Sequence, residues 1–155
     1  MRPQVSELLS RAPQGGRILD IGCAGFQVKA GSDALGRSDL RHSGLDYSAP
    51  DAVPHGVEFL SCDLNAQPIP APDDAFDVVI AGHVIEHMRD PIEFFGEAVR
   101  VLKPGGTLYL EAPSERSMML PGMWFAFDES RSLSFWDDPT HLGRPWPPQA
   151  LYRLA

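Results

Sequence analysis

Five short apolar segments recur along the first two thirds of the chain. They are residues 17–21, 42–46, 57–62, 76–81 and 107–112. Segments of this length are too short for core helices. In most of them apolar residues follow one another without the polar alternation expected of a strand that has one face in solvent. Such runs are typical of strands that are buried on both faces of a parallel sheet. The pattern therefore predicts five parallel strands.

The clearest predicted helix lies between the last two of these strands. Asp90 is a candidate N-cap, Pro91 fits the first helical position, and Glu93 is placed to complete a capping pattern. Apolar residues at three- and four-residue spacing predict one buried stripe, made of Ile92, Phe95, Val99 and Leu102. Residues 103–106, Lys-Pro-Gly-Gly, then end the helix and lead into the last strand.

Two weaker helices complete the alternation of strands and helices. Residues 5–11 predict a short leading helix, and residues 27–40 should hold a crossover helix. Gly31 and Gly36 interrupt the second segment, so we expect that helix to be short or distorted. The alternation predicts an α/β fold with a Rossmann-like, doubly wound sheet. In such a sheet the ligand lies outside the carboxyl ends of the strands, where the strand order reverses.

Three carboxylates stand at three successive predicted strand ends: Asp20, Asp46 and Asp63. Carboxylates are the strongest acceptors for the hydroxyls of a ribose and for an exocyclic amine. Acidic residues at the carboxyl edge of the sheet also favour a cationic ligand over a pyrophosphate. The alternative interpretation is that each aspartate caps the turn or helix that follows it.

The loop after the first strand reads Gly22-Cys23-Ala24-Gly25-Phe26. It lacks the glycines of the dinucleotide pattern G-x-G-x-x-G, which disfavours a nicotinamide-dependent oxidoreductase. Gly22 has no Cβ, so the backbone there can pass close to a ligand.

Three motifs resemble those of class I S-adenosylmethionine-dependent methyltransferases, with matching order and spacing over residues 15–114. Residues 18–23 resemble the first motif, residues 76–80 with 83–87 resemble the fourth-strand segment, and residues 100–108 resemble the turn into the fifth strand. A shorter match over residues 138–142 and 144–145 resembles members that methylate small molecules, including sugars of surface glycans. The resemblance implies the strand order 3-2-1-4-5 and methyl transfer to a small-molecule hydroxyl or amine.

The resemblance also implies S-adenosyl-L-methionine as cofactor and S-adenosyl-L-homocysteine as product. The implied cofactor contacts are Asp20 and Gly22 at the methionine end, Asp46 at the ribose, Asp63 and the Leu64 backbone at the adenine, and the backbone near Gly82 and His83 at the ammonium, with Cys23 and Tyr47 as further contacts. The family usually has glycine where this chain has Ala24 and Phe26. Phe26 would therefore either crowd the cofactor or stack beside it.

Two histidines are candidates for the general base that a hydroxyl acceptor needs: His83, directly after the fourth strand, and His141. Trp136, Asp138 and Arg144 are the candidate substrate-binding residues. Residues 83–87 also match the zinc-hydrolase pattern H-x-x-E-H. A zinc site of that kind needs both histidines on one face of a helix, but the helix beginning at Asp90 leaves room for about one turn. We therefore expect no metal, and expect His87 to pack structurally beside Glu86.

Composition divides the chain into two regions. The 155 residues fit one domain, and the 15 prolines are about twice the ordinary share. Six prolines and all three tryptophans lie in residues 113–148, after a cofactor-binding core over residues 1–112. The second region could be a lid over the substrate, a loop packed on the sheet edge, or a dimer contact.

Because the family usually has seven strands, we expect the sixth and seventh to be missing here. A homodimer could then form through the exposed sheet edge or through residues 113–148.

Charge and hydropathy narrow the function classes. The net charge of −8 argues against a nucleic-acid partner. No apolar stretch reaches the length of a membrane span or resembles a signal peptide, so we expect a cytoplasmic protein. Cys23 and Cys62 are expected to be free thiols. The hypothesis that competes with a small-molecule methyltransferase is a non-catalytic protein of the same fold that binds the cofactor or a partner subunit.

Overall fold

The computed structural model of the chain describes residues 1–120, 134–142, 145–147, 150 and 153. In these residues, five parallel strands form a single sheet in the order β3-β2-β1-β4-β5, as predicted. The strands are β1 (Arg17–Ile21), β2 (Arg41–Asp46), β3 (Val57–Ser61), β4 (Phe76–Gly82) and β5 (Leu102–Glu111). The strand order reverses between β1 and β4, which makes this the switch point where ligands bind in such sheets.

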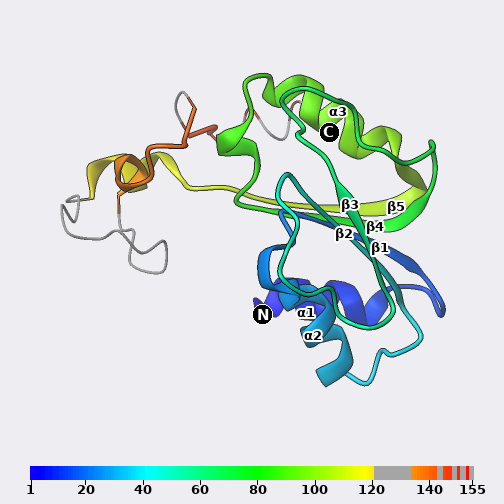
Figure 1. Ribbon diagram of the computed structural model, residues 1–155. Coiled ribbons are helices and arrows are strands. Elements are labelled where there is room, and N and C mark those ends of the chain that lie inside the picture. Colours follow the sequence, from blue (N-terminus) through cyan, green and yellow to red (C-terminus); the bar gives the residue numbers. More distant parts are fainter. Residues whose placement is uncertain (121–133, 143–144, 148–149, 151–152, 154–155) are drawn as a thin grey trace.

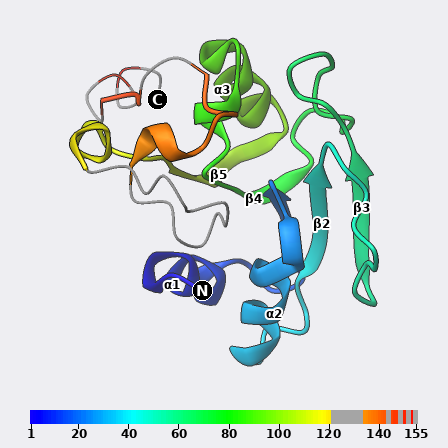
Figure 2. The same ribbon diagram turned by 60° about the vertical axis from the view of Figure 1, so that its left-hand side comes forward.

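Helices cover both faces of the sheet (Figure 1). Helices α1 (Pro3–Arg11) and α2 (Gln27–Ala34) lie on one face, and α3 (Pro91–Arg100) lies on the other. One apolar cluster joins α1, α2 and the sheet through Leu9, Val28 and Ile18, while a second joins α3 and the sheet through Phe94 and Val79. The turned view of Figure 2 places β3 at one edge of the sheet. As expected, α2 is short.

Helix α3 begins as its sequence predicts but buries a different face. The Asp90 side chain accepts hydrogen bonds from the backbone N–H groups of Ile92 and Glu93, at 3.0 and 2.9 Å. The predicted buried stripe is wrong, because Ile92 and Val99 are 58% and 46% exposed. The residues that face the sheet are instead Phe94, Ala98 and Val101. Both faces of this helix carry apolar residues at helical spacing, so only contact with the sheet decides which one is buried.

The two edge strands also differ from expectation. Strand β3 exposes Glu58 and Ser61, and β5 is only partly buried along its length, because each edge strand has one neighbour instead of two. Strand β5 starts at Leu102 rather than at Thr107, and its pairing with β4 shifts between these two residues. The prediction that residues 103–106 end the helix is therefore wrong: α3 ends at Arg100, and residues 103–106 form an irregularity within β5.

Short 3₁₀ helices connect or follow the strands: η1 (Ala24–Phe26), η2 (Ile85–His87), η3 (Glu115–Met119) and η5 (Phe135–Asp137). The last two lie beyond the carboxyl end of β5 (Figures 1 and 2). Both cysteines are free and buried, which confirms the prediction of free thiols. Of the helices in the described part of the chain, none combines the length and apolar character that a membrane crossing requires.

Candidate functional site

Asp20 and Asp46 lie beside one another at the carboxyl edge of the sheet. The register pairs Asp20 with Gly44, two residues before Asp46 at the end of β2. Burial, followed by the charge of the Asp46 carboxylate, raises the pKa of Asp20 to about 7. No basic side chain in the described part of the chain offsets this pair. The arrangement therefore favours a cation at this edge.

Gly22 holds the backbone loop that follows β1. Its φ is +74°, and its N–H donates to Leu45 O at 2.8 Å. A Cβ at this position would lie 2.8 Å from Cγ2 of Val84, so no other residue fits without movement. The neighbouring Cys23 is buried, and burial, followed by the charges of Asp20 and Asp46, raises the pKa of its thiol to about 12. Cys23 is thus an inert thiol beside the carboxylate pair.

Phe26 is buried against the second and third strands. It is 6% exposed, and its ring meets the Phe59 ring edge-on with centroids 6.5 Å apart. A Cβ on Gly44 would lie 3.0 Å from Cε1 of the Phe26 ring. The ring therefore packs on β2 and β3, although its backbone has the unfavourable φ of +50°.

The carboxylates of Asp46 and Asp63 cap the turns that follow them, in agreement with the alternative interpretation. Asp46 Oδ1 accepts the Ser48 N–H at 3.3 Å, and Asp63 Oδ1 accepts the Asn65 N–H at 3.0 Å. Each of these hydrogen bonds uses only Oδ1 of the carboxylate, so turn capping and ligand binding are compatible. Tyr47 is 78% exposed beside Asp46, whereas Leu64 packs against the apolar core.

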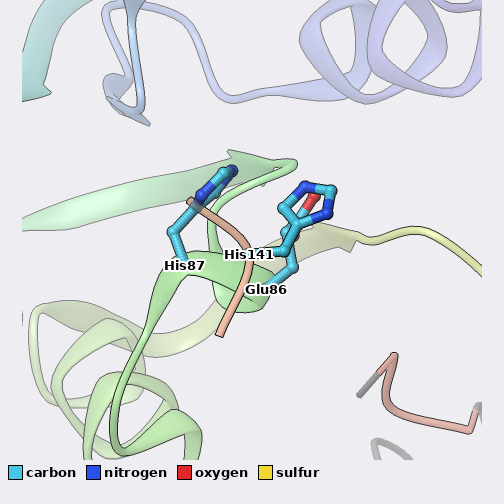
Figure 3. Close-up of side chains that lie close together, drawn as sticks. All are labelled: Glu86, His87 and His141. Atoms are coloured by element: carbon cyan, nitrogen blue, oxygen red, sulfur yellow. The ribbon is translucent and has the colours of Figure 1, made fainter. Parts of the chain in front are cut away.

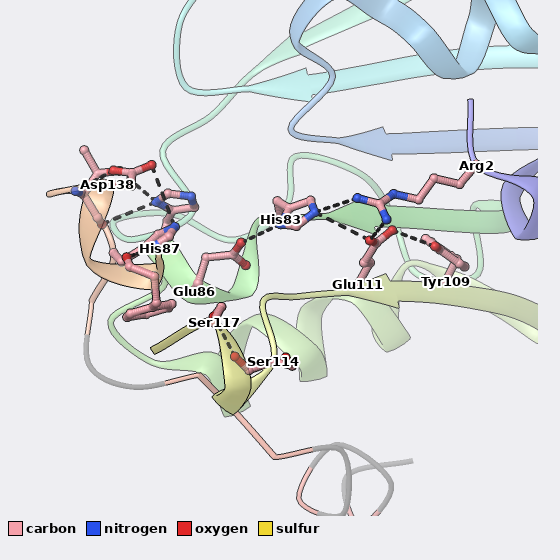
Figure 4. A network of polar contacts seen from close by, with 12 residues as sticks. Arg2, His83, Glu86, His87, Tyr109, Glu111, Ser114, Ser117 and Asp138 are labelled. Carbon is pink, nitrogen blue, oxygen red and sulfur yellow. Dashed lines mark hydrogen bonds and ion pairs between the residues drawn. The ribbon is translucent and has the colours of Figure 1, made fainter. Parts of the chain in front are cut away.

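His83 lies at the centre of a polar network at the end of β4 (Figure 4). Its φ is +58°, a strained conformation of the kind that clusters at functional sites. Nδ1 lies 3.1 Å from Glu86 Oε1, and Nε2 lies 3.0 Å from Arg2 Nη2 and 3.5 Å from Glu111 Oε1. Because a carboxylate only accepts, Nδ1 carries the proton in the neutral ring and Nε2 keeps a lone pair. The hydrogen bond to Glu86 raises the His83 pKa, and burial opposes that shift.

The sequence analysis did not assign three members of this network to the site: Arg2, Tyr109 and Glu111. Arg2 forms an ion pair with Glu111, and the Tyr109 hydroxyl donates to Glu111 Oε2 at 2.7 Å. Glu111 is recognisable as a polar residue that ends an apolar strand. Nothing in the sequence distinguishes Arg2, which reaches the site only because α1 packs under the sheet.

Residues 134–142 place His141 and Asp138 against η2. The Leu142 N–H donates to Glu86 O at 2.8 Å, which fixes this segment beside the end of β4. The His141 ring stacks on the buried Phe135 ring, with centroids 4.3 Å apart, and lies 4.8 Å from the His87 ring. Among the described residues, His83 and His141 do not contact each other directly, and Glu86 lies close to both. Trp136 is 60% exposed, and Arg144 lies outside the described residues.

A hollow of about 510 Å³ opens at the opposite end of the sheet. Its lining includes Asp77, Lys103 and Thr107, near the amino ends of β4 and β5, and none of the predicted site residues. We therefore assign the candidate site by the polar groups at the carboxyl edge rather than by this hollow.

Comparison with known proteins gives one family. Residues 19–110 match a family model described as "Methyltransferase domain". The chain is 32% identical over 122 residues to a Mycolicibacterium smegmatis protein named "Probable S-adenosylmethionine-dependent methyltransferase/", covering 76% of this chain and 46% of that protein. It is 31% identical over 100 residues to a ubiquinone biosynthesis O-methyltransferase of Cereibacter sphaeroides, covering 61% of this chain and 40% of the relative.

A solved structure shares the fold over almost the whole chain. A SAM-dependent methyltransferase from Archaeoglobus fulgidus superimposes with a TM-score of 0.64 and 23% identity, covering 99% of this chain and 66% of that one. The chain spans about half the length of the curated relatives it matches. The family model covers more than half of the chain, from within β1 to within β5, and includes all of β2, β3 and β4. The chain therefore belongs to the S-adenosylmethionine-dependent methyltransferase family.

Proposed function

We propose that this chain binds S-adenosylmethionine at the carboxyl edge of β1, β2 and β4 and supports methyl transfer to a small-molecule acceptor. The observation that carries the proposal is the pair Asp20 and Asp46 beside Gly22, two acids with no cation to offset them in the described residues. The cofactor carries a sulfonium and an ammonium group, so its charge suits this pair. When bound, it supplies an electrophilic methyl group for in-line displacement.

The residues of this edge fit the cofactor by their chemistry. Gly22 leaves its loop without a side chain, and the exposed Asp63 offers an acceptor near the adenine end. Asp46 would accept the ribose hydroxyls through charge-assisted hydrogen bonds. The backbone near Gly82 and His83, with Cys23, Tyr47 and Leu64, would complete the contacts that the family resemblance implies.

We further propose His83 as the general base for a hydroxyl acceptor. The bond between its Nδ1 and Glu86 orients the ring and leaves Nε2 able to take a proton. In this structure Nε2 accepts from Arg2, so an acceptor hydroxyl would replace the exposed Arg2 side chain as its partner. His141 is the second candidate, but its ring is held against Phe135.

A hydroxyl is the acceptor group that the comparisons support best, because several relatives are named O-methyltransferases. Trp136, Asp138 and Arg144 stay candidates for binding the acceptor, with a sugar as one class to test. A screen of sugars and small phenols or alcohols, with amines as the contrasting class, would assign it by release of S-adenosylhomocysteine. The homodimer and the cytoplasmic location stay predictions.

Calorimetric titration with S-adenosylmethionine and S-adenosylhomocysteine tests the proposal most directly. We expect both ligands to bind in a 1:1 ratio. Absence of binding to either would overturn the proposed function. Binding without turnover across the acceptor screen would instead favour a non-catalytic protein of the same fold.

Replacing Asp46 by alanine should weaken S-adenosylhomocysteine binding by about 10- to 100-fold, the value of hydrogen bonds to a charged group. Asp51→Ala is the matched control, because it removes the same charge from an exposed position a few residues further on. Calorimetry on the three proteins gives the comparison. An unchanged affinity in Asp46→Ala would show that this carboxylate does not hold the ribose.

A further inference from the structure

Glu86, His87 and His141 come together in space although the histidines are far apart in the sequence (Figure 3). One ligand atom from each residue can be chosen so that all three lie within 4.8 Å of one another. Glu86 and His87 belong to η2 after β4, whereas His141 follows η5. The hydrogen bond from Leu142 N–H to Glu86 O holds the two segments together.

Hydrogen bonds to the protein set the tautomer of both histidines. His141 Nδ1 lies 2.7 Å from Phe135 O, and His87 Nδ1 lies 3.3 Å from Thr140 O and 3.0 Å from Thr140 Oγ1. A carbonyl oxygen only accepts, so each Nδ1 donates its hydrogen and each Nε2 keeps its lone pair. Metal-binding histidines are oriented in this way, with one ring N–H donated to a carbonyl and the other nitrogen facing the ion.

The environment of the Glu86 carboxylate is the main evidence for a bound cation. Its side chain is 1% exposed, and Oε1 accepts from His83 Nδ1. Among the described residues, Oε2 is buried and has no hydrogen-bond partner. A buried carboxylate oxygen without a partner is costly, and a cation at this point would remove the cost.

Asp138 adds a second negative charge beside the cluster. Its Oδ1 accepts from Thr140 N–H at 2.8 Å, and its Oδ2 lies 3.8 Å from His141 Nε2. Two imidazole nitrogens with a buried carboxylate, next to another acid, form a donor set suited to a divalent transition metal.

We propose that Glu86, His87 and His141 bind a divalent transition-metal ion, with Zn²⁺ as the ion that this donor set fits best. Three protein ligands leave a coordination position for water or for a substrate oxygen. The proposal does not depend on methyl transfer. It revises our expectation of no metal, which considered His83 and His87 as the ligand pair. In the structure His83 is hydrogen-bonded to Glu86, and the second histidine of the cluster is His141.

The test is titration of the full chain, first stripped with a chelator, with Zn²⁺ by calorimetry and with Co²⁺ by visible absorption. We expect 1:1 binding by the wild type. Glu86→Gln, His87→Gln and His141→Gln should each weaken binding at least tenfold, because each removes a ligand. His55→Gln, which changes an exposed histidine outside the cluster, should leave the affinity unchanged.

Histidine NMR keeps the test decisive where a variant fails to fold. In the wild type, Zn²⁺ should shift the ring signals of His87 and His141 out of the five histidines. Failure of the wild type to bind Zn²⁺ or Co²⁺, or binding that perturbs other histidines instead, would overturn the proposal. S-adenosylhomocysteine titration of the same sample reports separately on the proposed cofactor site.

Discussion

Changing His83 to asparagine should lower kcat by about 10²- to 10⁴-fold with an acceptor found in the screen. The variant lacks the ring nitrogen that we propose takes the proton of the acceptor hydroxyl. Asparagine tolerates the left-handed φ of +58° at this position better than most residues, so the backbone should keep its course. Steady-state kinetics with S-adenosylmethionine and the acceptor gives the measurement.

Two further measurements, cofactor affinity and the kcat of a control variant, separate a proton-transfer role of His83 from a structural one. Affinity for S-adenosylhomocysteine should stay within about threefold of the wild type, because only the His83 backbone is assigned to the cofactor. His55→Asn, at an exposed position remote in sequence, should leave kcat unchanged. A kcat for His83→Asn close to that of the wild type would rule out His83 as the base and leave His141 as the candidate.

The second large effect concerns Asp20 and the pH dependence of stability. The folded carboxyl has a pKa of about 7, raised from 3.8 by burial and by Asp46. Between these two values the folded state holds a proton that the unfolded state has lost. The free energy of unfolding must therefore fall as pH rises from about 4 to 7. Asp20→Asn, which mimics the protonated side chain, should not show this fall.

The size of the difference follows from the shift in pKa. A shift of this extent corresponds to about 4 kcal/mol at most between pH 4 and pH 8. Urea unfolding of the wild type and of Asp20→Asn at several pH values measures this change in the free energy of unfolding. Subtracting one curve of unfolding free energy against pH from the other cancels the contribution of groups that titrate in both proteins. Among those is the buried His42, whose pKa burial lowers to about 4.

An exposed aspartate provides the control for charge removal alone. Asp51→Asn should follow the wild-type curve at every pH, because its side chain is exposed. Parallel curves for wild type and Asp20→Asn would show that Asp20 ionises normally in the folded protein. That result would contradict the burial of Asp20 and its proximity to Asp46, on which this prediction rests.

Local signals explain why much of the fold was predictable. Strand β1 runs from Arg17 to Ile21 as its apolar run predicts, and α3 starts after Asp90 because that side chain caps it. These features depend on residues within a few positions of each other. The buried face of α3 was not predictable in this way, since Ile92 and Phe94 both satisfy helical spacing and only the sheet chooses between them.

The same division holds for the candidate site. The order of apolar runs was enough to predict strand-end positions for Asp20, Asp46, Asp63 and His83, because a parallel sheet brings its carboxyl ends to one edge. The contact of Arg2 with His83, and that of His141 with Glu86 and His87, could be seen only in the folded chain. Those contacts depend on how α1 packs and where residues 134–142 return. No local pattern encodes such long-range packing, because many chain paths satisfy the same local preferences.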